Sequence, residues 1–287
     1  MQFNPNAVKT IDQATVENEG PRFPTVSWIS GDPSKKKAGG IEYRGGWFIG
    51  EDGAPADMTE YGWTKDSIIT GNGKEIEGYW AQEIKLSLIN HRRRWVVDGQ
   101  GFPWSNYQKA AELGHPRGHQ QFLVLIKGAE ELGAFSITLK GHAGMSFQGV
   151  KDYNGSGALS CFNRTVIAAA NIATKAQKLK WPYRAFWLPV GTSKDTEGNP
   201  CFTTVGSPPN TSNIVLPVPI GLPEKADGVD LNNYYIGDDL LQIVNQLHVE
   251  SADWVAMWDT ETNNSATEEQ DEENTEEINA SAEELGL

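Results

Sequence analysis

Alternation of apolar and polar residues predicts strands in the first half of the chain. Ile84–Ile89 alternates as a strand with one buried face does, and Thr25–Ile29 is rich in strand-forming residues. Two runs on either side of Gly71-Asn-Gly-Lys74 predict a hairpin around a glycine turn. The remaining strands are expected at Ser67–Thr70 and Glu75–Trp80 (the two hairpin arms), Ile41–Ile49 (bent at Gly45-Gly46), Arg93–Val97, Gln121–Ile126 and Ala134–Leu139.

The second half changes to helical spacing. Ala158–Lys180 contains no Gly and no Pro, and its last turns carry Lys175, Lys178 and Lys180, as the helix dipole favours. Asp238–Val249 predicts a short amphipathic helix with acidic residues in its first turn. A strand is expected near Tyr183–Leu188, and a Pro-, Ser- and Asn-rich loop over residues 206–224.

These elements predict a mostly β or α+β protein, built as an OB-like barrel or a strongly bent sheet with one long helix. Residues 1–20 are polar and aperiodic and are expected to form a flexible arm. Residues 21–258 are expected to form a single strand-rich body. Residues 259–287 are expected to be a disordered acidic tail, because they lack the apolar surface that ordering requires.

Charge divides the chain unevenly. The 287 residues include 24 Lys+Arg and 38 Asp+Glu, a net charge of -14. Residues 1–200 have a net charge of about +3, and residues 201–287, whose only basic residue is Lys225, have about −17. The 10 Trp, 8 Tyr and 10 Phe exclude a disordered body.

The same composition bears on the compartment. No apolar run has the length of a membrane helix, and the first 20 residues contain no apolar signal-peptide core. Cys161 and Cys201 do not form a disulfide framework. The cytoplasm of a bacterial host cell is therefore the expected location, with no membrane partner.

Catalytic motifs are poorly represented. The sequence has no phosphate loop, nucleophile elbow, HExxH or dinucleotide-binding motif, so neither an enzyme nor a cofactor is expected. His115 and His119 have metal-like spacing but are expected in an exposed loop. Asp52 and Asp57 read as turn residues, with a metal pair as the weaker alternative.

Basic and aromatic residues are interleaved most densely at His91–Trp95 (HRRRW). Guanidinium groups contact phosphates and an indole stacks on bases, so this segment predicts a nucleic-acid contact. On a regular strand, Arg93 and Trp95 share one face. The alternative is that the aromatics belong to the core and the cations to a solvated surface. The candidate nucleic-acid-binding residues are Lys35, Lys36, Lys37, Trp47, Trp80, Lys85, Arg92, Arg93, Arg94, Trp95, Trp104 and Tyr107.

A strand-rich basic body followed by an acidic segment resembles the layout of phage and bacterial single-stranded DNA-binding proteins. That resemblance implies an OB-type body and an acidic tail that competes with DNA and docks partner proteins. The terminal Glu284-Leu-Gly-Leu287 differs from the Pro-Phe or final Phe of those tails. Gly45-Gly-Trp-Phe-Ile49 and Ile137-Thr-Leu-Lys140-Gly141 resemble an uncharacterised family of cyanobacterial plasmids and phages.

The expected function is coating of single-stranded DNA, with little sequence preference, during replication or recombination. RNA is a possible ligand, because stacking does not distinguish the two sugars. Replication or recombination proteins are expected to bind the acidic tail, and a homo-oligomer is possible. The alternatives are a phage structural or assembly protein, a metal-dependent nuclease using Asp52 or Asp57, and a carbohydrate-binding module.

Overall fold

The structure is a computed structural model that describes residues 23–30, 32–36, 42–43, 45–69, 74–97, 107–114, 117–149, 157–194, 196, 201–207 and 210–256. The flexible arm predicted at residues 1–20 and the tail predicted at 259–287 both lie outside the described residues.

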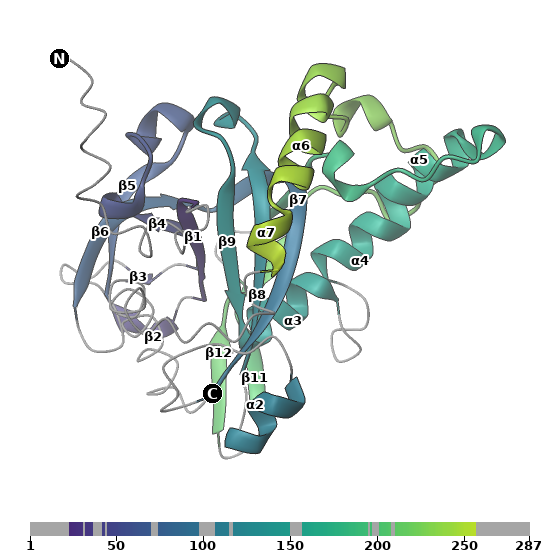
Figure 1. Cartoon of the computed structure of the whole chain (residues 1–287). Helices are drawn as coiled ribbons and strands as arrows, with labels where there is room; N and C mark the ends of the chain where they lie inside the picture. The colour runs from purple at the N-terminus through teal and green to yellow at the C-terminus, as the bar shows by residue number, and fades with distance from the viewer. Residues whose placement is uncertain are drawn as a thin grey trace, which may run out of the picture.

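A nine-stranded sheet organises the chain, in the order β13-β10-β7-β8-β9-β1-β4-β6-β5 (Figure 1). Every neighbouring pair is antiparallel except β1 and β9, which are parallel. The strands are β1 (Thr25–Ile29), β4 (Gly46–Gly50), β5 (Thr64–Ile69), β6 (Glu75–Ala81), β7 (Glu83–Val96), β8 (Arg117–Ile126), β9 (Phe135–Lys140), β10 (Leu188–Thr192) and β13 (Pro217–Pro219).

The sheet bends so that β4 approaches β10 and β7 across its inner face, which is the face that carries the main core. Two indoles hold this approach. Trp47 Nε1 donates to Val190 O at 3.1 Å, and Trp28 Nε1 donates to Val215 O at 3.0 Å. The described strands do not close into a barrel, because β13 and β5 end the order. The fold is therefore mixed α and β with a large, strongly bent sheet.

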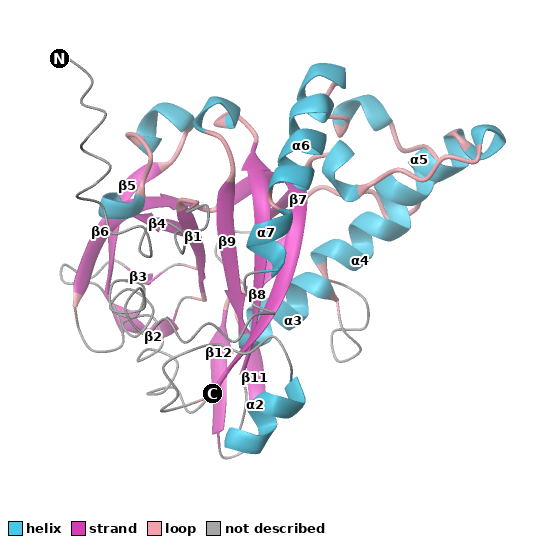
Figure 2. Cartoon of the chain, in the orientation of Figure 1, coloured by secondary structure: helices cyan, strands magenta, loops and turns pink. Residues whose placement is uncertain are grey.

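Two helices cover the outer face of β7 and β8, as Figure 2 shows. They are α6 (Asp238–Glu250) and α7 (Ala252–Ala256), which enclose a second core with Leu123, Leu125 and Trp187. On the inner side, α3 (Gly141–Gln148) packs on β8 and β9, and α4 (Ala158–Phe162) packs on β10 and β13.

From α4 the chain continues through a π-helical turn (Asn163–Ile167), α5 (Ala168–Ala173) and a 3₁₀ turn (Lys175–Gln177). We call residues 158–181 the helical arm, because it extends to one side of the sheet in Figure 1. Smaller elements are the β2–β3 pair (Asp32–Lys36 and Glu42–Tyr43), α2 (Tyr107–Leu113) and the β11–β12 hairpin (Thr203–Ser207 and Asn210–Ile214).

Several predicted elements are found. The predicted hairpin corresponds to β5 and β6, and the short helix near the end corresponds to α6. The long helix is confirmed only to Ala173, because Thr174 departs from helical geometry with φ of −105° and ψ of 14°. A 3₁₀ turn follows, and it ends at Lys178 in a left-handed conformation with φ of 56°. The prediction of a loop over residues 206–224 was wrong, because β12 and β13 lie within that range. The strand predicted at Tyr183–Leu188 begins later, at Leu188, after a 3₁₀ turn.

Within the described residues, no helix is both long and apolar enough to cross a membrane.

Candidate nucleic-acid interface

A β-bulge in β7 decides which face each cation occupies. The pairing with β8 shifts between Leu88 and Asn90, where one residue has no partner. Before the bulge, Leu86 and Leu88 point to the inner face. After it, His91, Arg93 and Trp95 share that face, opposite Phe122, Gln120 and Gly118, while Arg92 lies on the outer face.

Arg93 and Trp95 form an exposed cation and indole pair. The Arg93 guanidinium carbon lies 5.8 Å from the Trp95 ring centroid, so the two side chains share one face as predicted. Arg93 is exposed and Trp95 is half-buried. Gly118 lies opposite Trp95, and a Cβ there would come within 3.0 Å of the indole. One side of the Trp95 ring therefore packs on strand backbone.

The hydrogen-bond partners around Arg93 are neutral amides. Arg93 Nη2 donates to Gln148 Oε1 at 3.0 Å, at the last residue of α3. The Gln120 amide lies 2.8 Å from His91 Nε2 and 2.9 Å from Gln148 Nε2. If its oxygen and nitrogen are exchanged, Gln120 also accepts from Arg93 Nε at 2.6 Å. Amides position the guanidinium without cancelling its charge.

His91 lies beside this pair, on the same face of β7. One face of its ring stacks on Phe122, with centroids 4.6 Å apart, although His91 as a residue is exposed. Burial of that face lowers the pKa of His91 below its usual value, and the nearby Arg93 charge lowers it further, against a raising effect of the Gln120 hydrogen bond. Arg93 is therefore the permanent charge at this position.

Arg92 has a structural role on the outer face. Its guanidinium carbon lies 3.9 Å from the Trp254 ring centroid, its Nη1 donates to Trp254 O at 2.6 Å, and its Nε donates to Gln121 Oε1 at 2.8 Å. Arg92 thus fixes α7 to β7. Arg94 pairs through its backbone with His119, which pairs with Lys140. These three residues form the next cross-strand row, and the side chain of Arg94 is not described.

Charge is one-sided across these elements. Glu83, at the start of β7, is the only carboxylate in β7, β8, β9 and α3. Lys85 lies near Glu83, and the other cations gather at the opposite end of β7 and on its neighbours. They are Arg92, Arg93, Arg94, Arg117 and Lys140. We call Arg92–Val96 with Arg117–Gln121 the cationic ribbon end.

Two of the predicted stacking residues are not available there. Trp47 is fully buried, so its proposed stacking role was wrong. Trp80 is half-buried on β6 against Phe48 and Ile76. Its indole N–H is buried without a hydrogen-bond partner among the described residues. Trp80 lies three residues before Glu83, at the start of β7, whereas Arg93 lies ten residues further along that strand, about 33 Å away.

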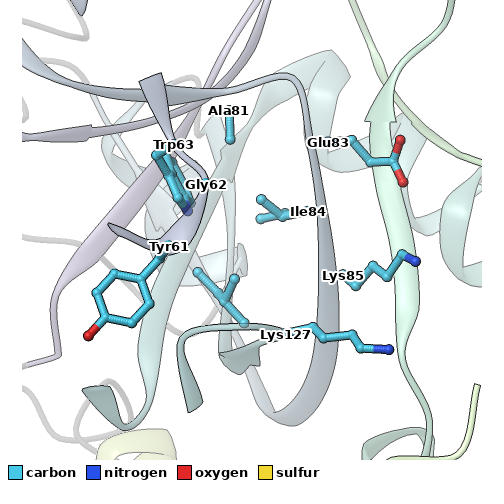
Figure 3. A pocket seen from close by; sticks show the side chains of 9 residues that line it. Tyr61, Gly62, Trp63, Ala81, Glu83, Ile84, Lys85 and Lys127 are labelled. Carbon is cyan, nitrogen blue, oxygen red and sulfur yellow. The ribbon is translucent and has the colours of Figure 1, made fainter. Parts of the chain in front are cut away.

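Lys85 is also remote from Arg93. It is exposed on β7 eight residues before Arg93, which corresponds to about 26 Å along the strand. It borders a small cleft of about 220 Å³ that Trp63, Ile84 and Ile126 also line. In Figure 3, Lys85 and Lys127 point away from Trp63 and Ile84. The cleft therefore lacks the convergent polar groups of a ligand site.

The remaining candidates are only partly placed. Lys35 and Lys36 lie on β2 and Tyr107 begins α2, but their side chains are not described. Lys37 and Trp104 lie outside the described residues. The expectation of an exposed loop at His119 was wrong, because His119 is buried on β8.

Of the two carboxylates proposed for a nuclease, Asp57 has a structural role, and Asp52 is exposed in a 3₁₀ turn (Glu51–Gly53). Asp57 caps a 3₁₀ turn (Met58–Tyr61) by accepting from Thr59 N at 3.0 Å and Thr59 Oγ1 at 2.7 Å. These hydrogen bonds lower the pKa of Asp57. Among the described residues, no group of three or more His, Cys, Asp or Glu could hold a metal ion.

Sequence reasoning missed the residues that position Arg93 and Arg92. Gln120, Gln148 and Trp254 lie 27 or more positions away in the chain, and no local motif marks them. One signal was available in the sequence: residues Ile84 to Val97 contain no Asp or Glu, which indicates the cationic ribbon end.

Comparisons with known protein families, with curated proteins and with solved structures find no match for this chain.

Proposed function

We propose that this protein binds single-stranded nucleic acid at the cationic ribbon end, with DNA as the expected ligand. Arg93 contacts a backbone phosphate, and Trp95 stacks on a base next to it. The observation that carries the proposal is the exposed Arg93 guanidinium, held by neutral amides beside a half-exposed indole.

The charge distribution supports the same ligand. A surface built from three strands and one helix with a single carboxylate at its far end attracts a polyanion. No base-reading geometry is needed, because stacking tolerates every base. The protein would accordingly coat DNA, with little sequence preference, in the cytoplasm during replication or recombination. The acidic C-terminal segment would modulate this binding when it is not held elsewhere on the chain, and it would dock partner proteins. An OB-type course of the chain remains part of this proposal only.

Fluorescence anisotropy of a labelled oligo(dT) with the full-length protein tests the proposal. The wild-type protein should bind at about 50 mM salt and weaken steeply by about 200 mM salt, because phosphate neutralisation releases counterions. Arg93→Ala should reduce the salt slope by about one. Trp95→Ala should lower affinity by about 5- to 150-fold, as expected for loss of one stacked base. Oligo(U) in place of oligo(dT) measures the preference between DNA and RNA.

The matched control is Lys225→Ala, an exposed cation outside these strands. Its affinity should stay within twofold of the wild-type value. Urea unfolding of each variant separates loss of binding from loss of fold. Absence of wild-type binding at low salt, or equal effects of Arg93→Ala and Lys225→Ala, would reject the proposal.

A structural or assembly role is the second candidate. Ile243 and Val249 on α6 are 52% and 71% exposed, as residues of a subunit contact can be before assembly. Light scattering with and without DNA distinguishes the two functions. An assembly protein would associate without DNA, and Ile243→Lys would reduce that association.

A further inference from the structure

The tip of the helical arm is exposed and basic. All residues from Lys175 to Lys180 are exposed. The side chains of Lys175, Lys178 and Lys180 form no ion pair or hydrogen bond with a described residue. From Gly157 to Lys194 the sequence contains no Asp or Glu, so no carboxylate within this stretch offsets those charges.

The same tip presents apolar side chains to solvent. Ile172, which precedes the three lysines, is 66% exposed, and Leu179, between Lys178 and Lys180, is 55% exposed. Single exposed apolar residues are common on protein surfaces. Two of them interleaved with three unpaired lysines form a surface suited to an acidic segment that carries its own apolar residues.

The tip has a fixed shape. Trp181 N donates to Asn171 Oδ1 at 3.0 Å, which ties the returning chain to α5. Trp181 packs edge-on against Phe186 and Tyr235 at the base of the arm. Lys178 is the only described residue other than glycine with a positive φ, 56°. Such a conformation costs about 1 kcal/mol, and strained positions are frequent at functional sites.

The chain itself contains a segment with the complementary chemistry. Residues 259–287 carry 11 acidic residues and no basic ones, and they include Ile278, Leu285 and Leu287. We propose that this C-terminal segment docks on the tip of the helical arm of the same chain. Its carboxylates would pair with Lys175, Lys178 and Lys180, and its apolar residues would cover Ile172 and Leu179.

The length of the segment permits this contact. The 31 residues that follow Ala256 can span at most about 100 Å, whereas a folded chain of this size has a radius of gyration of about 19 Å. Tethering also gives the segment a high effective concentration, on the order of millimolar, at its own arm. A contact within one chain is therefore favoured over a contact between chains in dilute solution.

The arm suits this segment better than the cationic ribbon end does. Arg92 is covered by Trp254, and Arg93 is held by Gln148, whereas the three arm lysines have no described partners. The arm also offers aliphatic contacts to leucines. Docking there would leave the cationic ribbon end open, and the inference does not depend on nucleic-acid binding.

Carbodiimide cross-linking of the full-length protein, with an equal mixture of ¹⁴N- and ¹⁵N-labelled chains, tests the contact directly. Mass spectrometry should find the segment's carboxylates joined mainly to Lys175, Lys178 and Lys180 within single-isotope chains. Mixed-isotope links would replace this inference with docking on a second copy. Links mainly to lysines outside the arm would overturn it.

Proteolysis of the segment by a glutamate-specific protease is the second measurement. Docking protects the segment, so K175E/K178E/K180E should raise its cleavage rate about fivefold or more at low salt. The matched control is K127E/K194E/K225E, which makes the same change of charge at exposed lysines elsewhere. K175R/K178R/K180R should retain the slow rate. Equal rates in the two glutamate variants would overturn the inference.

Discussion

The Arg92 guanidinium carbon lies 3.9 Å from the centroid of the Trp254 ring, and Arg92 Nη1 also donates to the carbonyl oxygen of Trp254 at 2.6 Å. The first residue of the predicted arginine cluster therefore fastens the last described helix to the sheet. Its neighbour Arg93, one position along the strand, presents its charge on the opposite face. Alternation along one strand thus separates an arginine that packs under Trp254 from one whose guanidinium is exposed.

Arg92→Ala should lower the free energy of unfolding by about 2 kcal/mol, because a desolvated cation–π contact and charged hydrogen bonds are lost together. Urea unfolding followed by tryptophan fluorescence measures this change. Arg92→Lys should recover only part of the loss, since lysine cannot make the same two hydrogen bonds. If Arg92→Ala instead left stability unchanged and weakened oligonucleotide binding, Arg92 would be a phosphate contact.

Trp47→Phe should lower the free energy of unfolding by about 1–2 kcal/mol, because the carbonyl of Val190 loses its indole donor inside the core. Trp47→Ala should cost about 3–5 kcal/mol, since a large cavity is left. Affinity for oligo(dT) should stay within about twofold for Trp47→Phe under conditions where the variant is folded. A tenfold loss of affinity in a stable Trp47→Phe protein would contradict its placement in the core.

Acid should destabilise the fold partly through His91. Its pKa in the folded protein lies below the usual 6.5, so the unfolded chain takes up a proton first as the pH falls. The stabilisation is complete above about pH 6.5 and decreases as the pH falls towards the folded-state pKa. Burial lowers the pKa of His142 in the same direction. Urea midpoints at about pH 7.5 and about pH 5 should therefore differ less in H91Q/H142Q than in the wild type.

Gly157→Ala should lower the free energy of unfolding by about 2–3 kcal/mol. A Cβ at residue 157 would overlap Ser146 O and Gly149 N, where the end of α3 meets the start of α4. Gly53→Ala is the matched control, because a Cβ there meets no atom within 4 Å. Thermal unfolding of both variants checks the difference, and similar melting temperatures would contradict the close packing at Gly157.

Local patterns predicted the hairpin of β5 and β6 and the helix α6, because turn chemistry and helical spacing are properties of neighbouring residues. The face shared by Arg93 and Trp95 followed from alternation alone. The parallel pairing of β1 with β9 and the joining of Ile84–Ile89 and Arg93–Val97 into one bulged strand depended on distant partners. No local pattern specified them.

Burial distinguishes the exposed candidate residues from those in the core. Trp47 and Trp95 occupy similar sequence contexts, next to apolar residues on strands. Trp47 faces β10 across the bend of the sheet, whereas Trp95 lies beyond the main core, opposite Gly118. The curvature of a nine-stranded sheet is not encoded in any short segment. Local patterns therefore predicted the cluster of Arg93 and Trp95. They also grouped Trp47 and Trp80 with it, although both lie in other parts of the sheet.

The parallel contact between β1 and β9 has a consequence for synthesis of the chain on the ribosome. Val26 is fully buried between strands, yet its partner Ile137 leaves the ribosome more than one hundred residues later. Until then, β1 is an unpaired sheet edge with an apolar row, which is a template for association with other nascent chains. The indole N–H of Trp47 lacks its acceptor for longer still, because the carbonyl of Val190 is synthesised later. Early folding of the N-terminal half is therefore reversible, and the chain commits to its fold only when nearly two thirds of it have been translated.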